Sequence, residues 1–76
     1  MKKSIYSEKQ RRLCDLLRRS RIRAGFTQTD LSKKIGRPQS FVAKYEGGER
    51  RLDVIELLEI TKIIGLPFKE VLSAII

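Results

Sequence analysis

The chain has 76 residues and a net charge of +8, with 41% hydrophobic residues, one cysteine and no histidine. Its length allows one domain, whose core lies near the lower size limit for folding without covalent or metal cross-links. A disulfide within the chain and a zinc site of cysteines and histidines are excluded, so packed helices or a partner subunit must supply the stability.

Three sequence patterns predict where helices begin. In each, a small side chain that carries an oxygen is followed three residues later by a side chain that can accept a hydrogen bond. The pairs are Ser7 and Gln10, Thr27 and Asp30, and Asp53 and Glu56. Such pairs satisfy the unpaired backbone N–H groups of a first helical turn. The first and third pairs resemble capping boxes, and the second is a looser version.

Glycines predict where the helices end, because glycine readily adopts the left-handed backbone that often follows a last helical turn. These glycines are Gly25, Gly36, Gly47, Gly48 and Gly65. Beginnings and ends together predict five helices, over residues 8–24, 28–35, 39–46, 53–64 and 68–75. Alternating β-branched patterns are scarce. We therefore expect one all-α, compact five-helix domain over residues 1–76, with a candidate flexible arm at residues 1–7.

Residues 27–46 combine two short predicted helices with a tight connection at Gly36-Arg37-Pro38. Gly36 permits a sharp exit from the first of these helices, and Pro38 fixes the start of the second. The second helix would then present three polar side chains of types that hydrogen-bond the edges of DNA bases. These residues are Gln39, Ser40 and Lys44. An exposed short helix with this chemistry fits the major groove of duplex DNA.

The last two predicted helices carry more apolar residues than one side of a small domain can bury. Four residues are expected to face the core: Val54, Leu57, Ile60 and Ile64. Six others are candidates for a second apolar surface: Ile55, Leu58, Ile63, Val71, Ile75 and Ile76. An exposed apolar patch usually marks an interface, so we expect a homodimer formed through the carboxy-terminal third. The alternative is that these residues complete the core of a monomer.

The basic charge is concentrated in the first two thirds of the chain. Residues 1–26 carry nine lysines and arginines against two acidic residues, and residues 27–52 carry six against three. Residues 53–76 carry two against four, so the last third is slightly acidic. A one-sided basic surface suits a polyanion such as nucleic acid. The alternative is a solvated basic surface that aids solubility.

Several segments in this order resemble a known family. They are Leu17-Arg-Arg-Ser-Arg21, Gly25-Phe-Thr-Gln28, Leu31-Ser-Lys-Lys-Ile-Gly36, Gln39-Ser-Phe-Val42, Tyr45-Glu-Gly-Gly-Glu-Arg50, and Leu57-Leu-Glu-Ile60 to Ile64-Gly65. Residues 17–72 thereby resemble the phage repressor and Cro class of helix-turn-helix proteins, the XRE family. The resemblance implies a lambda-repressor-like fold, with the helix-turn-helix formed by helices 2 and 3, and sequence-specific binding to double-stranded DNA.

The resemblance also implies roles for individual residues. The base-reading residues would be Gln39, Ser40, Lys44 and Phe41, and the phosphate-binding residues would be Gln28, Arg37, Arg50 and Arg51. For Gln39, Ser40 and Lys44, a nearby phosphate is the alternative to a base. Phe41 has an alternative, because it can instead turn inward beside Val42. Arg21 and Glu46 match a partly buried ion pair that ties the first helix to the end of the recognition helix. The alternative for this pair is two separate surface charges.

Some positions lie outside this pattern or depart from it. Ser20 stands where a larger apolar residue is usual and Thr61 where alanine is usual, which implies small differences in packing. No proline precedes the fourth helix. The basic residues near the amino terminus are either an arm that reaches DNA or a solvated tail. These are Lys2, Lys3, Lys9, Arg11 and Arg12.

The sequence contains no catalytic constellation and no metal-ligand cluster, so we expect neither an enzyme nor a metal, cofactor or small-molecule ligand. It lacks the run of apolar residues that a membrane span needs, and one unpaired cysteine fits a reducing compartment, so we expect a cytoplasmic protein. The interpretation is a transcriptional regulator, acting as a repressor, that binds a palindromic operator as a dimer. The alternative is an antitoxin or co-regulator whose main partner is another protein.

Overall fold

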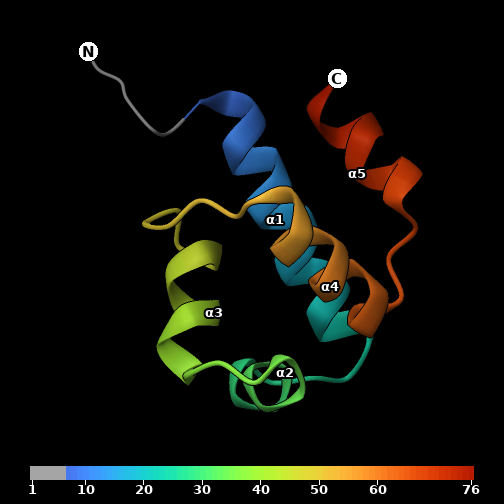
Figure 1. Ribbon diagram of the computed structural model, residues 1–76. Coiled ribbons are helices and arrows are strands. Elements are labelled where there is room, and N and C mark those ends of the chain that lie inside the picture. Colours follow the sequence, from blue (N-terminus) through green and yellow to red (C-terminus); the bar gives the residue numbers. More distant parts are fainter. Residues whose placement is uncertain (1–6) are drawn as a thin grey trace.

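The computed structural model describes residues 7–76, which form five α-helices and no β-strand (Figure 1). The helices are α1 (Glu8–Arg23), α2 (Gln28–Ile35), α3 (Gln39–Glu46), α4 (Val54–Ile64) and α5 (Phe68–Ile75). The expected all-α architecture is confirmed, and α1 and α4 are each one residue shorter than predicted. Residues 1–6, which include Lys2, Lys3 and most of the predicted arm, lie outside the described residues. None of the helices within residues 7–76 is long and apolar enough to cross a membrane.

The predicted caps explain why α1, α2 and α4 begin where they do. The Ser7 hydroxyl accepts a hydrogen bond from the Gln10 N–H at 3.0 Å. Thr27 and Asp30 exchange both bonds of a full capping box, at 3.0 and 2.9 Å, although their sequence pattern suggests a looser version. A second full box joins Asp53 and Glu56 at the start of α4, at 3.0 and 2.7 Å. Local chemistry therefore sets these three helix starts.

The connection between α2 and α3 is as tight as its composition suggests. Gly36 ends α2 with φ of 73°, in the left-handed region that favours glycine, and its N–H donates to carbonyl groups in the last turn of α2. Pro38 precedes α3 in an extended conformation, with φ of −61°. The turn thus holds two helices of eight residues each in direct contact.

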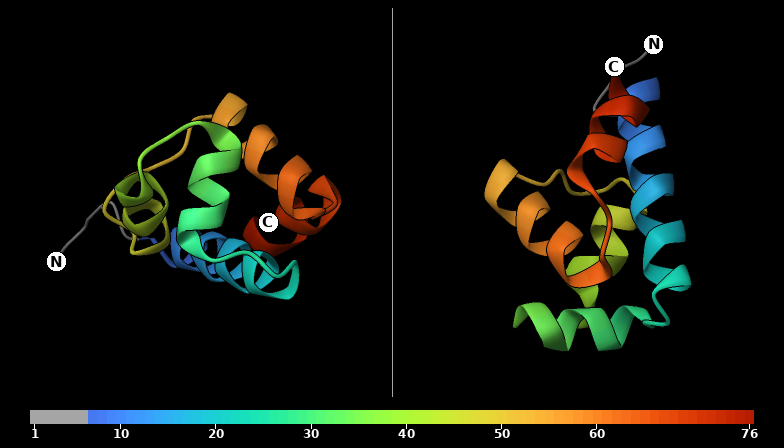
Figure 2. Two further views of the ribbon diagram at one scale, coloured as in Figure 1. Left: turned by 90° about the horizontal axis from the view of Figure 1, so that it is seen from below. Right: turned by 90° about the vertical axis from the view of Figure 1, so that its right-hand side faces the viewer.

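One hydrophobic core joins all five helices. Its buried members are Leu17, Leu31, Phe41, Val42, Tyr45, Leu57, Ile60, Ile64, Leu66 and Val71. Helix α1 packs against α3, α4 and α5, and α2 packs against α3 and α4. Figure 2 shows α2 lying across one end of the assembly formed by α1, α4 and α5. Helix α3 lies at a side of the molecule (Figure 1). Its residues Gln39, Ser40 and Lys44 are exposed.

The structure corrects three expectations about apolar side chains. Val54 is predicted to face the core but is 64% exposed, because a side chain in a first helical turn points back beyond the helix end. Val71 is predicted at a second surface but is fully buried, because its side of α5 packs against the core. Phe41, a predicted base-reading residue, is 7% exposed, so the inward alternative is the observed one.

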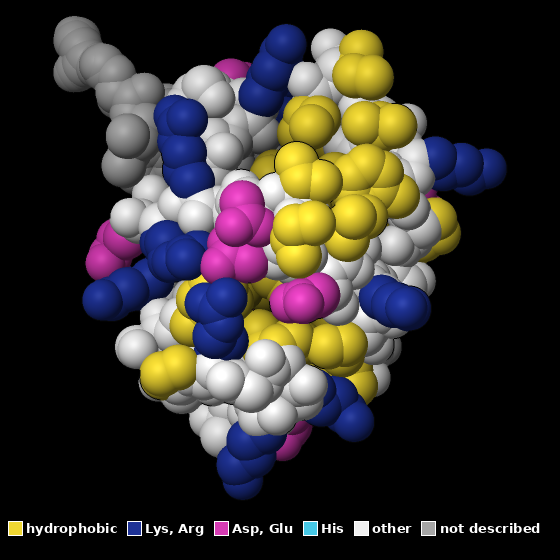
Figure 3. Space-filling model, viewed as in Figure 1, with side chains coloured by type: hydrophobic (Ala, Val, Ile, Leu, Met, Phe, Trp, Pro, Cys, Tyr) yellow, Lys and Arg dark blue, Asp and Glu magenta, His cyan; other side chains and the backbone are white. Residues whose placement is uncertain are grey.

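Of the remaining candidates for the second apolar surface, Ile55, Leu58 and Ile76 are exposed as predicted, whereas the other two are not. Ile63 and Ile75 are partly buried and pack against the core. The exposed apolar residues of α4 and α5, with the carboxy-terminal residue, are Val54, Ile55, Leu58, Leu72 and Ile76. Figure 3 shows hydrophobic side chains gathered on this part of the molecule. An apolar surface is therefore present, with a composition that differs in part from the predicted one.

The two positions that depart from the resembled pattern are both buried. The Thr61 hydroxyl donates a hydrogen bond to the Leu58 carbonyl at 3.1 Å, which satisfies it within α4. The Ser20 hydroxyl has no hydrogen-bond partner among the described residues, and it lines a cavity of about 100 Å³ beside Ile64 and Leu66. The small side chain of Ser20 thus leaves space where α1 passes the connection between α4 and α5.

Candidate nucleic-acid interface

Helix α3 separates its side chains between the core and the solvent. Val42 and Tyr45 are buried on its inner face, whereas Gln39, Ser40 and Lys44 are exposed. All three exposed side chains carry hydrogen-bonding groups suited to base edges. An α-helix with its side chains is about 10–12 Å in diameter, which fits the major groove of B-DNA, about 12 Å wide. Helix α3 is therefore a short helix with one face in the core and one exposed polar face.

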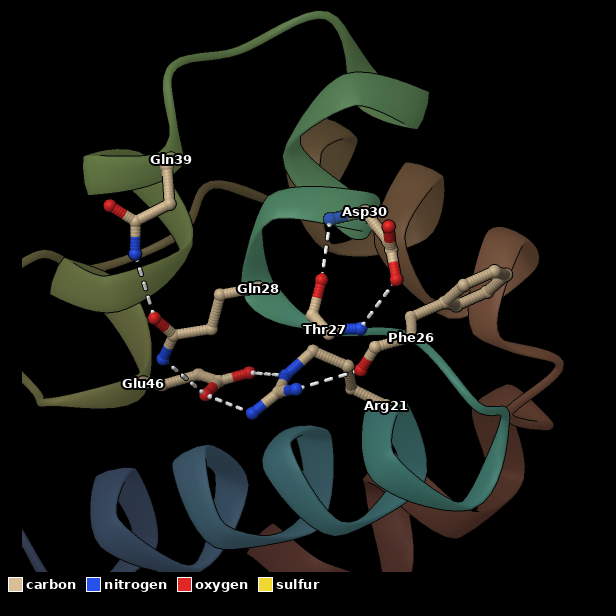
Figure 4. Close-up of polar contacts among 7 residues, drawn as sticks. All are labelled: Arg21, Phe26, Thr27, Gln28, Asp30, Gln39 and Glu46. Atoms are coloured by element: carbon tan, nitrogen blue, oxygen red, sulfur yellow. Dashed lines mark hydrogen bonds and ion pairs between the residues drawn. The ribbon is translucent and has the colours of Figure 1, made fainter.

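A buried ion pair holds α3 against α1. The Arg21 Nε lies 2.6 Å from Glu46 Oε2, and Arg21 Nη2 lies 3.1 Å from Glu46 Oε1 (Figure 4). The two side chains are 9% and 3% exposed. Arg21 Nη1 also donates to the Phe26 carbonyl at 2.8 Å, which extends the contact to the segment before α2. The bidentate hydrogen bonding to Glu46 raises the pKa of Arg21 above its ordinary value.

A second tie between α1 and α3 lies close to this pair. The Cys14 thiol is buried and donates a hydrogen bond to the Tyr45 carbonyl at 3.1 Å. Burial is the main cause that raises the pKa of Cys14, so the group remains a thiol. Cys14 therefore acts here as a small core residue whose thiol also donates to a carbonyl in the last turn of α3.

Two glutamines continue the polar network from Glu46 to the exposed face. Gln28 Nε2 donates to Glu46 Oε1 at 3.1 Å, and Gln39 Nε2 donates to Gln28 Oε1 at 2.9 Å (Figure 4). Each amide therefore has a defined orientation in the free protein. Gln39 uses one N–H in this contact, so its second N–H and its carbonyl oxygen remain for a partner outside the chain.

Arg37 and Arg50 converge on one carboxylate, although they come from different connections. Arg37 Nη2 lies 3.0 Å from Glu56 Oε2, and Arg50 Nη2 lies 2.9 Å from the same oxygen. Arg50 Nη1 also donates to Glu56 Oε1, at 3.0 Å. Both guanidinium groups lie over the Phe41 ring, at 4.5 and 4.7 Å from its centroid. The Phe41 side chain therefore supports two arginines instead of facing solvent.

Hydrogen bonds hold the Glu56 carboxylate in its charged form. Its pKa falls from 4.5 to about 2, chiefly through the hydrogen bond from Arg50 and then through the Asp53 N–H, with a further contribution from Arg37. Burial opposes this shift but does not overcome it. Glu56 is consequently a carboxylate at neutral pH, and the cluster of two arginines and one glutamate keeps a net positive charge.

The structure brings together most of the predicted site residues, with some unexpected partners. Gln28 and Gln39 bond to each other, and Arg37 and Arg50 share Glu56. Arg51 is exposed, and its carbonyl accepts from Arg50 at 2.9 Å. Sequence reasoning assigned Glu56 only to the α4 cap and missed its second role. No helical spacing identifies that role, because Glu56 lies 19 positions from Arg37 and 6 positions from Arg50, neither of which lies in the same helix.

The Arg21–Glu46 pair generates a prediction about stability. Arg21→Met should lower the free energy of unfolding by about 3 kcal/mol, because it leaves a buried carboxylate without its main partner. Glu46→Gln should also destabilise, and the double variant should cost less than the two single variants together, with a coupling energy of about 1–3 kcal/mol. Chemical denaturation of the four proteins measures this cycle. Additive single effects would show that the two residues act independently.

A comparison with known protein families supports the interpretation of α2 and α3 as a helix-turn-helix. The model of the helix-turn-helix domain matches residues 12–73, which include all five helices almost completely. No curated protein matches the chain. Among residues 7–76, no group of three or more histidine, cysteine or acidic side chains is placed to hold a metal ion. The match covers far more than half of the chain, and the α2–α3 pair has the expected turn and exposed face, so this protein belongs to the helix-turn-helix domain family.

Proposed function

We propose that this protein is a sequence-specific regulator of transcription that binds duplex DNA with α3 in the major groove. The observation that carries the proposal is the exposed face of α3, whose Gln39 is held in a fixed orientation by Gln28. A side chain that is already oriented loses little conformational freedom on binding. Its remaining amide groups match the donor and acceptor that adenine presents in the major groove.

The proposed interface separates base contacts from phosphate contacts. Gln39, Ser40 and Lys44 face outward on α3 and would contact bases. Arg37 and Arg50 flank α3 in the connections before and after it, where they would contact phosphates, as would the exposed Arg51. Phosphate contacts position a protein on the duplex but carry no sequence information. The resemblance to phage repressors and Cro proteins supports the same division of roles and favours action as a repressor.

The charge distribution supports this orientation toward DNA. The first 52 residues carry fifteen lysines and arginines against five acidic residues, and the last 24 carry two against four. A basic portion attracts the phosphate backbone, and a slightly acidic portion is repelled by it. The carboxy-terminal helices are therefore expected to face away from the duplex.

We also propose that two copies of this chain pair through the apolar surface of α4 and α5. Ile55 and Leu58 are 65% and 43% exposed on α4, and Leu72 on α5 and the carboxy-terminal Ile76 are 42% and 86% exposed. The hydrophobic side chains gathered there in Figure 3 form the kind of exposed patch that commonly marks an interface. A second copy of this chain is the partner that we favour for this surface. Contact between the two weakly charged carboxy-terminal thirds would keep the strongly basic portions of the two copies apart. A two-fold pair would bind a palindromic operator.

Binding to duplex DNA is the first test. The protein should bind at low salt, and the logarithm of its affinity should fall against the logarithm of salt concentration with a slope near −5 if about six phosphates are contacted per dimer. Fluorescence anisotropy with a labelled duplex measures the slope. No affinity for any duplex at low salt would refute the proposed function.

The second test separates the two kinds of contact. Gln39→Ala and Lys44→Ala should relax sequence preference, and each base contact that is removed should cost about 1–3 kcal/mol on the preferred site. Arg51→Ala should instead weaken binding to preferred and random duplexes about equally. Selection from a randomised duplex pool identifies the preferred site and gives the specificity of each variant. Equal losses of specificity in all three variants would contradict this division.

The third test concerns the dimer. Ile55→Lys should shift the protein toward the monomer in sedimentation experiments, because it places a charge within the apolar surface. Ile22→Lys is the matched control, since Ile22 is 56% exposed on α1 and lies outside that surface. The control should sediment like the wild type. A wild-type protein that stays monomeric at micromolar concentration, alone and with DNA, would rule out the pairing.

A further inference from the structure

Two arginines that flank the recognition helix are already fixed before any ligand arrives. Arg37 comes from the turn before α3 and Arg50 from the connection after it, and their side chains are 40% and 38% exposed. Both contact the Glu56 carboxylate, and both lie within 5 Å of the Phe41 ring centroid. Long arginine side chains on a protein surface ordinarily sample many rotamers. Here Glu56 and the Phe41 ring hold the two arginine side chains next to each other.

The residue that gathers them is itself held firmly. Glu56 lies in the first turn of α4, and its Oε1 accepts the Asp53 N–H at 3.0 Å as part of the capping box. Its side chain is 10% exposed. Oε1 also accepts from Arg50, and Oε2 accepts from both arginines. Four hydrogen bonds thus converge on a carboxylate that the start of α4 keeps in position.

The arginines keep donors for another acceptor. Arg37 gives one N–H to Glu56, and a guanidinium carries five. Planar guanidinium groups bind phosphate with paired hydrogen bonds, which requires a defined orientation. The buried Phe41 ring lies against both groups, and the two arginine side chains remain 40% and 38% exposed. The cluster therefore has the geometry of a prepared phosphate-binding site.

We infer that Glu56 is a positioning residue for DNA binding, which holds Arg37 and Arg50 in the orientation that engages the phosphate backbone beside α3. This inference rests on the proposed function and adds to it an acidic residue that promotes binding to a polyanion. Simple electrostatics gives the opposite expectation, because a carboxylate repels phosphate and its removal raises the net charge. The two effects differ in sign, so one substitution distinguishes them.

The variant that makes this distinction is Glu56→Gln. Glutamine keeps the oxygen that accepts the Asp53 N–H, so the cap of α4 is retained. It replaces the other oxygen with an NH₂ group, which cannot accept from Arg37. Glu49→Gln is the matched control, since it removes the same charge from an exposed carboxylate in the same α3–α4 connection. Circular dichroism establishes a temperature at which all the proteins are folded.

The measurement is affinity for a random-sequence duplex over a range of salt concentrations, because phosphate contacts do not depend on sequence. At physiological salt, Glu56→Gln should weaken binding by about fivefold for each phosphate that the arginines no longer engage, and the salt slope should fall by about one for each such phosphate. Glu49→Gln should bind as tightly as the wild type or slightly tighter, with an unchanged slope. A role of Glu56 in folding alone would leave the slope unchanged.

The outcomes separate this inference from the proposed function. If the wild type has no affinity for duplex DNA, the proposed function itself fails. If the wild type binds and Glu56→Gln binds equally or more tightly, the positioning role is overturned and the proposed function stands. Arg37→Lys provides a second route if Glu56→Gln does not fold, because it keeps the charge but removes the planar group. It should bind several-fold more weakly, and wild-type affinity would overturn the inference.

Discussion

The contact on which the rest of the structure depends is the buried ion pair between Arg21 and Glu46. It joins the end of α3 to α1 with two hydrogen bonds, of 2.6 and 3.1 Å, and both side chains are almost excluded from solvent. A buried pair of this kind adds little net stability, because desolvation offsets much of its attraction. Its value is geometric, since breaking it leaves a buried charge without its main partner. The position of α3 relative to α1 is thereby restricted to one arrangement.

The orientation of the exposed face follows from that restriction. Glu46 accepts from Gln28, Gln28 accepts from Gln39, and the first residue of α3 is thus linked to the buried pair. Glu56 has a comparable place on the other side of α3, where it gathers Arg37 and Arg50 over the Phe41 ring. Two carboxylates with little solvent exposure therefore organise the polar and basic groups around one short helix. The common physical basis is that a shielded acceptor must be satisfied by donors in fixed positions.

The molecule divides its surface between two kinds of chemistry. Polar and basic groups surround α3, whereas apolar side chains gather on α4 and α5 (Figure 3). Small domains of this size have few ways to bury additional apolar area within themselves. An exposed apolar surface is therefore a feature that a partner would cover, and a second copy would bury this surface while keeping the strongly basic portions apart. This division supports the proposal of a regulator with separate DNA and subunit surfaces.

The sequence by itself determined the five helices, the starts of three of them and the tight turn, because capping pairs and Gly36 act on backbone within a few residues. The resemblance also identified Arg21 and Glu46 as partners. Only the tertiary structure decided which apolar residues are buried: Val54 is exposed and Val71 is not, since helical periodicity does not say which boundary positions a neighbouring helix covers. It also decided that Phe41 turns inward and that Glu56 binds arginines from two connections. The Arg37–Glu56 contact joins residues 19 positions apart, and Arg50 reaches Glu56 across the connection before α4, so no helical spacing encodes either contact.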